Sequence, residues 1–299
     1  MTTSSWITIT APDSTVLDLD DRVNTILETD ARGLLMPTFE FGIESLTQNL
    51  SRYQQVKASK RVLELPVMVL DSTQTLLEAR IAAISKALNP LLGASALTIT
   101  RKDGTQRVLT CRYLSGLEGD WGNGQFALTW QRFILNFQAI DPAWYAAVPT
   151  VETYSCAPAG AFFTEDDDDE TPFLPLNLSE STVVSKSTIT NPGDFECWPI
   201  WQITGPGDGL ILRNLTTGKN LFLPIAIAPS EIITIDMTPD QKSVLSSLGT
   251  NYFPQMARVV GSALWSLICG DNEVQVELNN TISDQSLIEL AFQPAYVSS

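Results

Sequence analysis

The 299-residue sequence contains no histidine. Histidine is the side chain whose ordinary pKa lies near neutrality, and it acts as the base in Ser-His-Asp and Cys-His catalysis. Its absence excludes these hydrolase mechanisms and every zinc site that needs an imidazole ligand. The cysteines lie far apart in the sequence and lack the CxxC spacing of a cysteine-only zinc site; they are Cys111, Cys156, Cys197 and Cys269. We interpret them as ordinary reduced thiols.

Long apolar segments and targeting signals are also missing. No run of about 18 uninterrupted apolar residues occurs, so we expect no membrane helix. Residues 1–10 show no basic segment followed by an apolar run, so we expect no signal peptide. The Gly218-Lys219 pair is followed by Asn220 where a phosphate-binding loop needs Ser or Thr. These absences favour a non-catalytic protein without a cofactor.

Basic residues are scarce, and the second half of the chain has the fewest. Residues 1–145 contain 15 acidic and 13 basic side chains, whereas residues 146–299 contain 19 acidic and 5 basic ones; the two balances, −2 and −14, add up to the net charge of −16. Such asymmetry indicates two domains with different surroundings. The acidic half is not expected to bind nucleic acid through its phosphates.

The first half reads as β-strands around one helix. Residues 33–42 look extended, and residues 61–70 alternate with a period of two, which predicts a strand that Pro66 places at an edge or a bulge. Apolar residues at helical spacing predict one helix over residues 72–88, with Asp71 or Ser72 as its N-cap. Asp103-Gly104 predicts a hairpin between strands at 96–101 and 106–114. A phase slip predicts one long strand at 126–140 with a bulge near Gln131-Arg132.

Asp141-Pro142 ends this strand, and we place the domain boundary at about residue 146, giving domains 1–145 and 146–299. The acidic run Glu165–Glu170 is interpreted as a solvated loop rather than a calcium site, because it lacks the spaced ligands of an EF-hand. Short strands with turn residues between them predict an antiparallel β-sandwich in the second domain. The expected strands are residues 182–190, 197–204, 209–214, 220–227, 231–237, 257–260, 274–278 and 286–292.

Several landmarks occur in an order that resembles the distal tail proteins of long-tailed phages, and the likeness covers residues 33–296. The landmarks are the Asp141-Pro142-Ala143-Trp144-Tyr145 segment, Asn191-Pro192-Gly193-Asp194 with Pro199, the strand from Glu231 to Asp236, and the turn containing Gly270 and Asn272. The sequence departs from the family at Ser230, where glycine is common.

The resemblance implies a mainly β protein whose first domain forms a ring, usually of six copies, and whose second domain is a galectin-like β-sandwich. It implies a structural protein of the phage tail tip in the virion, synthesised in the host cytoplasm. The implied partners are the tail tube protein, the tail hub protein and receptor-binding or tail fibre proteins. The ring would enclose the path of the DNA without reading its sequence. The resemblance brings no catalytic, cofactor or metal residues.

Three groups of residues carry an alternative interpretation. The Asp141–Tyr145 segment is either a docking point for the second domain or a strand terminator whose aromatics cover the core; we favour the terminator. Glu231 and Asp236 could suggest a glycosidase pair, but their odd spacing in a strand points them to opposite faces. Trp198 and Trp201 could stack on a glycan, which makes a glycan-binding adhesion module the alternative function. We favour a role for both in the core.

Overall fold

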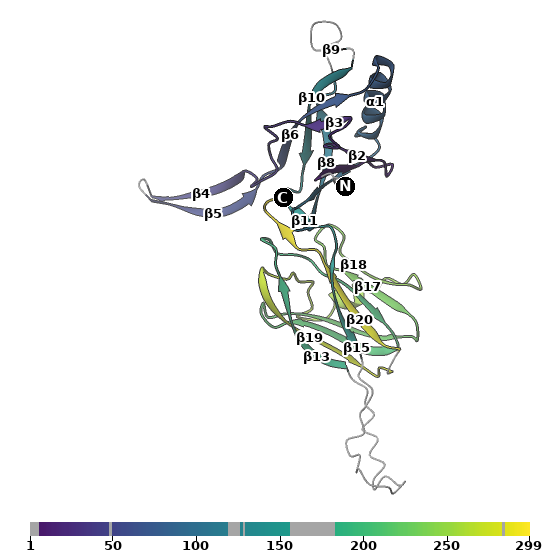
Figure 1. Cartoon of the computed structure of the whole chain (residues 1–299). Coiled ribbons are helices and arrows are strands. Elements are labelled where there is room, and N and C mark those ends of the chain that lie inside the picture. Colours follow the sequence, from purple (N-terminus) through teal and green to yellow (C-terminus); the bar gives the residue numbers. More distant parts are fainter. Residues whose placement is uncertain (1–5, 48–49, 119–125, 128, 156–182, 283–284) are drawn as a thin grey trace, which may run out of the picture. The chain divides into compact units, whose positions relative to one another are not determined.

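The computed structural model of the protein describes residues 6–47, 50–118, 126–127, 129–155, 183–282 and 285–299. The acidic run Glu165–Glu170 and Cys156 lie outside these residues. The chain divides into two compact units, Met1–Val148 with Ala295–Ser299, and Pro149–Pro294 (Figure 1). Both units are built from antiparallel sheets, which confirms the mainly β fold.

The C-terminal residues belong to a different unit from the one predicted, because the sequence-based division gave all of 146–299 to the second domain. Ala295–Ser299 belong to the first unit. The physical reason is strand pairing, because β21 (Ala295–Tyr296) forms an antiparallel pair with β11 (Trp144–Ala146).

A ten-stranded sheet forms the body of the first unit, with its main strands in the order β2-β1-β7-β8-β10-β6-β3. The strands besides β11 and β21 are β1 (Ile7–Thr10), β2 (Val16–Asp18), β3 (Thr25–Leu27), β6 (Arg61–Leu70), β7 (Ser95–Thr100), β8 (Gln106–Ser115), β9 (Phe126–Ala127) and β10 (Trp130–Ala139). Two further strands, β4 (Phe39–Thr47) and β5 (Leu50–Ala58), form a separate two-stranded sheet.

The predicted helix is α1 (Gln74–Ala87). Its N-cap is Thr73, whose side chain accepts a hydrogen bond from the backbone N–H of Leu76, so the prediction of Asp71 or Ser72 as the cap is wrong. Asp71 instead forms an ion pair with Arg80 at 2.9 Å. The helix buries Leu77 and Ile84 in the core of the first unit, as their spacing predicted.

Pro66 lies in an interior strand, so its prediction as an edge or bulge residue is wrong. Along β6 the residue pairs with Ile134 of β10, and on the other side β3 pairs with residues 67–69. On the β3 side, the carbonyl of Pro66 accepts a hydrogen bond from Glu28 N. On the same side, the backbone N–H and C=O of Glu64 pair with those of Arg32. The nitrogen of Pro66 therefore faces the gap between β3 and the Arg32–Glu64 bridge, where the ladder needs no donor.

The predicted long strand at 126–140 is two strands. Trp130 at the start of β10 pairs antiparallel with Ala127 of β9, and β10 keeps an unbroken register with β6, so the predicted bulge at Gln131-Arg132 is wrong. The slip in phase falls between these two strands and not within β10. The side chains of Phe133, Leu135 and Phe137 on β10 are buried, one at every second residue.

The second unit is an antiparallel β-sandwich of two sheets, with strand orders β12-β20-β14-β17-β18 and β13-β19-β15-β16. The strands are β12 (Thr150–Ser155), β13 (Val183–Asn191), β14 (Ile200–Thr204), β15 (Gly207–Asn214), β16 (Lys219–Ile227), β17 (Ile232–Asp236), β18 (Ser243–Ser246), β19 (Gly270–Asn279) and β20 (Leu287–Phe292). Seven of them were predicted, whereas β12 and β18 were not. Residues 257–260 form no strand, because the chain there leaves the short helix α2 (Phe253–Ala257).

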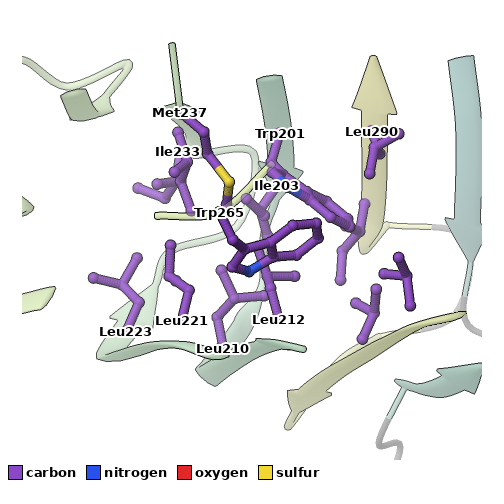
Figure 2. Close-up of a cluster of buried hydrophobic side chains, with 14 of the residues drawn as sticks. Trp201, Ile203, Leu210, Leu212, Leu221, Leu223, Ile233, Met237, Trp265 and Leu290 are labelled. Carbon is purple, nitrogen blue, oxygen red and sulfur yellow. The ribbon is translucent and has the colours of Figure 1, made fainter. Parts of the chain in front are cut away.

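The core of the sandwich lies between its two sheets. Figure 2 shows Trp201 and Ile203 from one sheet facing Leu212 and Leu221 from the other, with Trp265 between them. All five side chains are fully buried. This closed packing around two indoles gives the second unit a core of its own.

Candidate assembly surface

The hairpin of β4 and β5, here called the arm, extends away from the ten-stranded sheet (Figure 1). Its two strands pair in antiparallel register from Phe39 opposite Ala58 outward. An isolated two-stranded ribbon is at best marginally stable in water, because it has no second layer to bury its side chains. A long ribbon of this kind is therefore expected to gain stability from a partner surface.

One face of the arm is apolar and exposed. Phe41 lies directly opposite Val56 in the register, and Ile43 follows two residues later on the same face. Their exposed fractions are 56% for Phe41, 55% for Val56 and 63% for Ile43. Adjacent large apolar side chains exposed on a monomer mark a protein interaction surface more often than chance placement does.

The other face of the arm is charged. Glu44 forms an ion pair with Arg52 at 2.8 Å, and Glu40 accepts a hydrogen bond from Ser59 Oγ at 2.8 Å. Lys57 stands opposite Glu40 in the register. Such exposed pairs add little stability, but they keep this face solvated. Among its described side chains the arm is thus amphipathic, with an apolar face that a partner protein would bury.

The base of the arm is closed by Arg61, which is only 2% exposed. Its guanidinium donates hydrogen bonds to the carbonyl of Gly33 at 2.6 Å and to that of Leu35, both on the chain that enters the arm. It also donates to Pro142 O at 3.0 Å and Val297 O at 2.7 Å. Burial lowers the pKa of Arg61 to about 10, so the side chain stays charged at neutral pH.

The Asp141–Tyr145 segment is a structural terminator within the first unit. Asp141 accepts hydrogen bonds from Ala143 N at 3.0 Å and from Tyr145 Oη at 2.6 Å, which fixes the turn after Pro142. Trp144 is fully buried in the core of the first unit. The geometry agrees with our favoured interpretation of these residues as a core cover.

Asn191 and Asn272, predicted as family landmarks, are buried and bind backbone. Asn191 donates to Phe195 O at 2.9 Å and accepts from Gly193 N at 3.0 Å, which shapes the turn that also holds the exposed Asp194. Asn272 accepts from Ile268 N at 2.9 Å. These residues hold turns of the sandwich.

The remaining landmarks are also structural. Pro199 is buried next to the core and its carbonyl accepts from Met237 N at 3.3 Å. Gly270 has a φ of +84°, which favours glycine. Glu231 is 5% exposed and accepts from Ala228 N at 2.9 Å and from Ser246 Oγ. Asp236 accepts from Thr238 N at 2.8 Å.

The two tryptophans considered for glycan stacking differ in burial. Trp201 is fully buried and lies in the centre of the sandwich, so the favoured core role is confirmed for it and the alternative of a glycan contact is wrong. Trp198 is partly buried and packs against the same core. An aromatic platform for a sugar needs an open ring face, and Trp201 offers none.

Within the described part of the chain, no cluster of three or more metal-ligating side chains occurs. In the same residues, no helix has the length and apolarity required to cross a bilayer. The arm, by contrast, was missed by the sequence analysis, which noted only that residues 33–42 look extended. A period of two normally predicts a buried face, and nothing in the sequence shows that this face is left open.

Comparison with solved structures shows a likeness over nearly the whole chain. The Dit protein of phage SPP1, described as a paradigm of the hub adsorption apparatus in phages that infect Gram-positive hosts, matches with a TM-score of 0.63 and 16% identity over 97% of this chain and 98% of its own. A chain of the phage P2 baseplate in its activated conformation with Ca matches with a TM-score of 0.55 and 12% identity over 98% of this chain and 99% of its own.

A second structure of the p2 baseplate, activated with Sr, matches with a TM-score of 0.51 and 12% identity over 95% of this chain and 97% of its own. No protein-family model and no curated protein sequence matches the chain. The comparisons therefore show that the chain has the fold of these hub and baseplate proteins across both of its units.

Proposed function

We propose that this protein is a structural component of a phage tail tip, a distal tail protein whose copies assemble into a closed ring. The observation that carries the proposal is the likeness to the SPP1 Dit protein across 97% of the chain, both units included. The family landmarks in the sequence point independently to the same role. The protein would lie in the virion, at the tip of the tail.

The arm supports assembly from identical copies. Its apolar face is exposed, and a matching surface on a second copy of the chain gives a head-to-tail contact that closes into a ring when the rotation is right. The first 145 residues are nearly neutral, whereas residues 146–299 carry about −14. Like charges repel, so second units are expected on the outside of such a ring, where they are farthest apart.

The family resemblance supplies the number six and the neighbours. A ring of six would join the tail tube to the tail hub and to receptor-binding or fibre proteins, and would surround the DNA path without sequence-specific contacts. The second unit would be the galectin-like domain that the resemblance implies. We expect no enzymatic activity, because the chain lacks histidine and the carboxylates of Glu231 and Asp236 serve in turns.

Light scattering on the purified protein tests the ring. Six copies of the 32.8-kDa chain would weigh about 197 kDa. We expect the double variant Phe41→Glu, Ile43→Glu to shift the mass toward the monomer, because it places charges on the apolar face of the arm. The double variant Glu40→Gln, Lys57→Gln on the solvated face is the matched control and should keep the native mass.

Negative-stain images should show rings with a central opening for the native protein and the control. A native protein that remains monomeric at all concentrations would contradict the proposed ring. An equal decrease of the assembly mass in both double variants would show that the arm acts through its own stability and not through its apolar face.

A further inference from the structure

The C-terminal residues Ala295–Ser299 form a strap across the first unit, held mainly by arginines. Tyr296 pairs with Trp144, and the guanidinium of Arg107 stands 3.6 Å from the centroid of the Tyr296 ring. Beyond the pairing, each successive carbonyl of the strap accepts from a different arginine. Val297 O accepts from Arg61, Ser298 O from Arg107, and Ser299 O from Arg101 at 2.6 Å.

The strap also touches the chain that enters the arm. Ser299 N donates to Leu34 O at 3.1 Å, and Arg61 bonds the neighbouring carbonyls of Gly33 and Leu35. Arg61 itself comes three residues after β5, at the exit of the arm. Entry, exit and strap therefore meet at one buried guanidinium.

The geometry points to the strap as a lock on the arm: when Val297–Ser299 are docked, the base of the arm is fixed, and when they are absent it is free to open. Arg61 is buried over the Trp144 ring, and its described hydrogen-bond acceptors are backbone carbonyls. A buried charge that loses an acceptor must draw in water or move, because an unpaired buried donor is costly. Loss of the strap therefore loosens the same guanidinium that holds Gly33 and Leu35.

At Val297–Ser299 the described arginine contacts of the lock go to backbone oxygens and not to side chains. All three arginines reach carbonyl oxygens, so Val297, Ser298 and Ser299 can change identity as long as they remain in place. An experiment can therefore compare a variant that lacks these residues with a variant in which only their side chains are changed.

The lock also orders events during synthesis. The strap lies in sequence after the whole of Pro149–Pro294, so the first unit has a fixed arm only after the second unit has been made. Domains fold as units while the chain is produced from its N-terminus. The consequence for assembly, that an incomplete chain does not enter a ring, rests on the proposed function; the locking of the arm does not.

Hydrogen exchange on the full chain tests the lock, at a dilution where the native protein is monomeric. The probes are the amides of Arg32 and Ser59, which donate to Glu64 O at 2.9 Å and Thr38 O at 2.8 Å at the base of the arm. We expect deletion of residues 297–299 to speed their exchange about tenfold or more. The variant with Val297, Ser298 and Ser299 all changed to Ala keeps the carbonyls and should exchange at the native rate.

A second variant avoids any change in chain length. Arg101→Met removes the donor to Ser299 O, and the described hydrogen bonds of the Arg101 side chain do not include residues 33–35. We expect it to speed exchange at Arg32 and Ser59 in the same direction, while amides of β10 remain at the native rate. Native exchange at the arm base in the deletion variant overturns the lock.

Uniformly faster exchange through β10 also overturns it, because the strap would then be a general stabiliser. The two proposals fail separately. A native protein that never assembles refutes the ring but leaves the exchange result valid. A ring with unchanged exchange at the arm base refutes only the lock.

Discussion

The indole rings of Trp201 and Trp265 meet edge to face in the sandwich core, with centroids 5.9 Å apart and planes at 74° (Figure 2). Tyr154 stacks on Trp201 at 6.2 Å. The Nε1 atoms of both tryptophans are buried and have no hydrogen-bond partner among the described residues. The pair therefore stabilises the sandwich through packing and ring geometry alone.

Removing one of these rings should destabilise the second unit. We expect Trp265→Ala to lower its free energy of unfolding by about 3–5 kcal/mol, because a large buried side chain leaves a cavity. Trp265→Phe should cost much less, since it keeps an aromatic ring and deletes an unpaired N–H. Urea unfolding followed by circular dichroism measures both. Equal losses for Ala and Phe would show that the ring contact contributes nothing.

Asn272 should be the most sensitive polar residue of the sandwich. It is fully buried, accepts from Ile268 N at 2.9 Å and donates to Ile268 O at 2.8 Å and Gly270 O at 3.0 Å. Asn272→Ala leaves these backbone groups unpaired, so we expect a loss of about 3 kcal/mol in unfolding free energy.

The matched control for Asn272 is Asn220→Ala, because Asn220 is half-exposed and its carbonyl accepts from Ala263 N through the backbone. It should change stability by less than about 0.5 kcal/mol. A similar midpoint in urea for both variants would contradict a special role for Asn272.

Substitutions at Gly33 and Gly104 distinguish the cost of backbone strain from the cost of a steric clash. Both have left-handed φ angles, +83° and +84°. A Cβ on Gly33 would lie 2.1 Å from Val62 O, whereas a Cβ on Gly104 would meet no atom within 4 Å. We expect Gly104→Ala to cost about 1 kcal/mol, and Gly33→Ala several times more. Thermal unfolding measures both, and equal shifts of Tm would refute the close approach.

The buried thiols should be protected in the folded protein. Burial raises the pKa of Cys111 and of Cys197 to about 12 from an ordinary 9.0, whereas Cys269 is exposed. At pH 8 we expect iodoacetamide to label Cys269 and to spare the other two until urea is added, as peptide mass spectrometry will show. Fast labelling of Cys111 in the native protein would contradict its burial.

The same shifts give a pH dependence with a defined sign. The pKa of each buried thiol is higher in the folded than in the unfolded chain, so its contribution to stability is fully present below about pH 9 and is lost as the pH rises toward about 12. Replacing Cys111 with Ala should reduce this alkaline loss. An unchanged alkaline profile would show that other groups cause it.

Local patterns predicted the regular parts of the fold. The alternation in β6, the helical spacing of α1 and the Asp103-Gly104 turn each contain their own signal over a few residues. The positions that failed depend on distant partners. Pro66 is tolerated in the interior of the sheet because the chain after β3 leaves the ladder there.

The landmarks proved easier to find than to interpret. Asn191 and Asn272 carry turn chemistry that their residue type suggests, and both bind backbone. The core role favoured for Trp201 rested on the general burial of tryptophan, because an indole in a core and an indole on a sugar platform have the same local pattern. The sequence analysis missed the arm and Arg61 for a related reason. The exposure of the arm and the burial of Arg61 are both decided by residues far away in the chain.

The pairing of β11 with β21 gives the molecule an unusual topology. These two antiparallel neighbours form a β-hairpin in the first unit, and the entire second unit is the loop that connects them. A hairpin accepts any loop whose two ends lie side by side. The sandwich is thus a domain inserted into the first unit. Another domain with adjacent termini could replace it without altering the register of the β11–β21 pair.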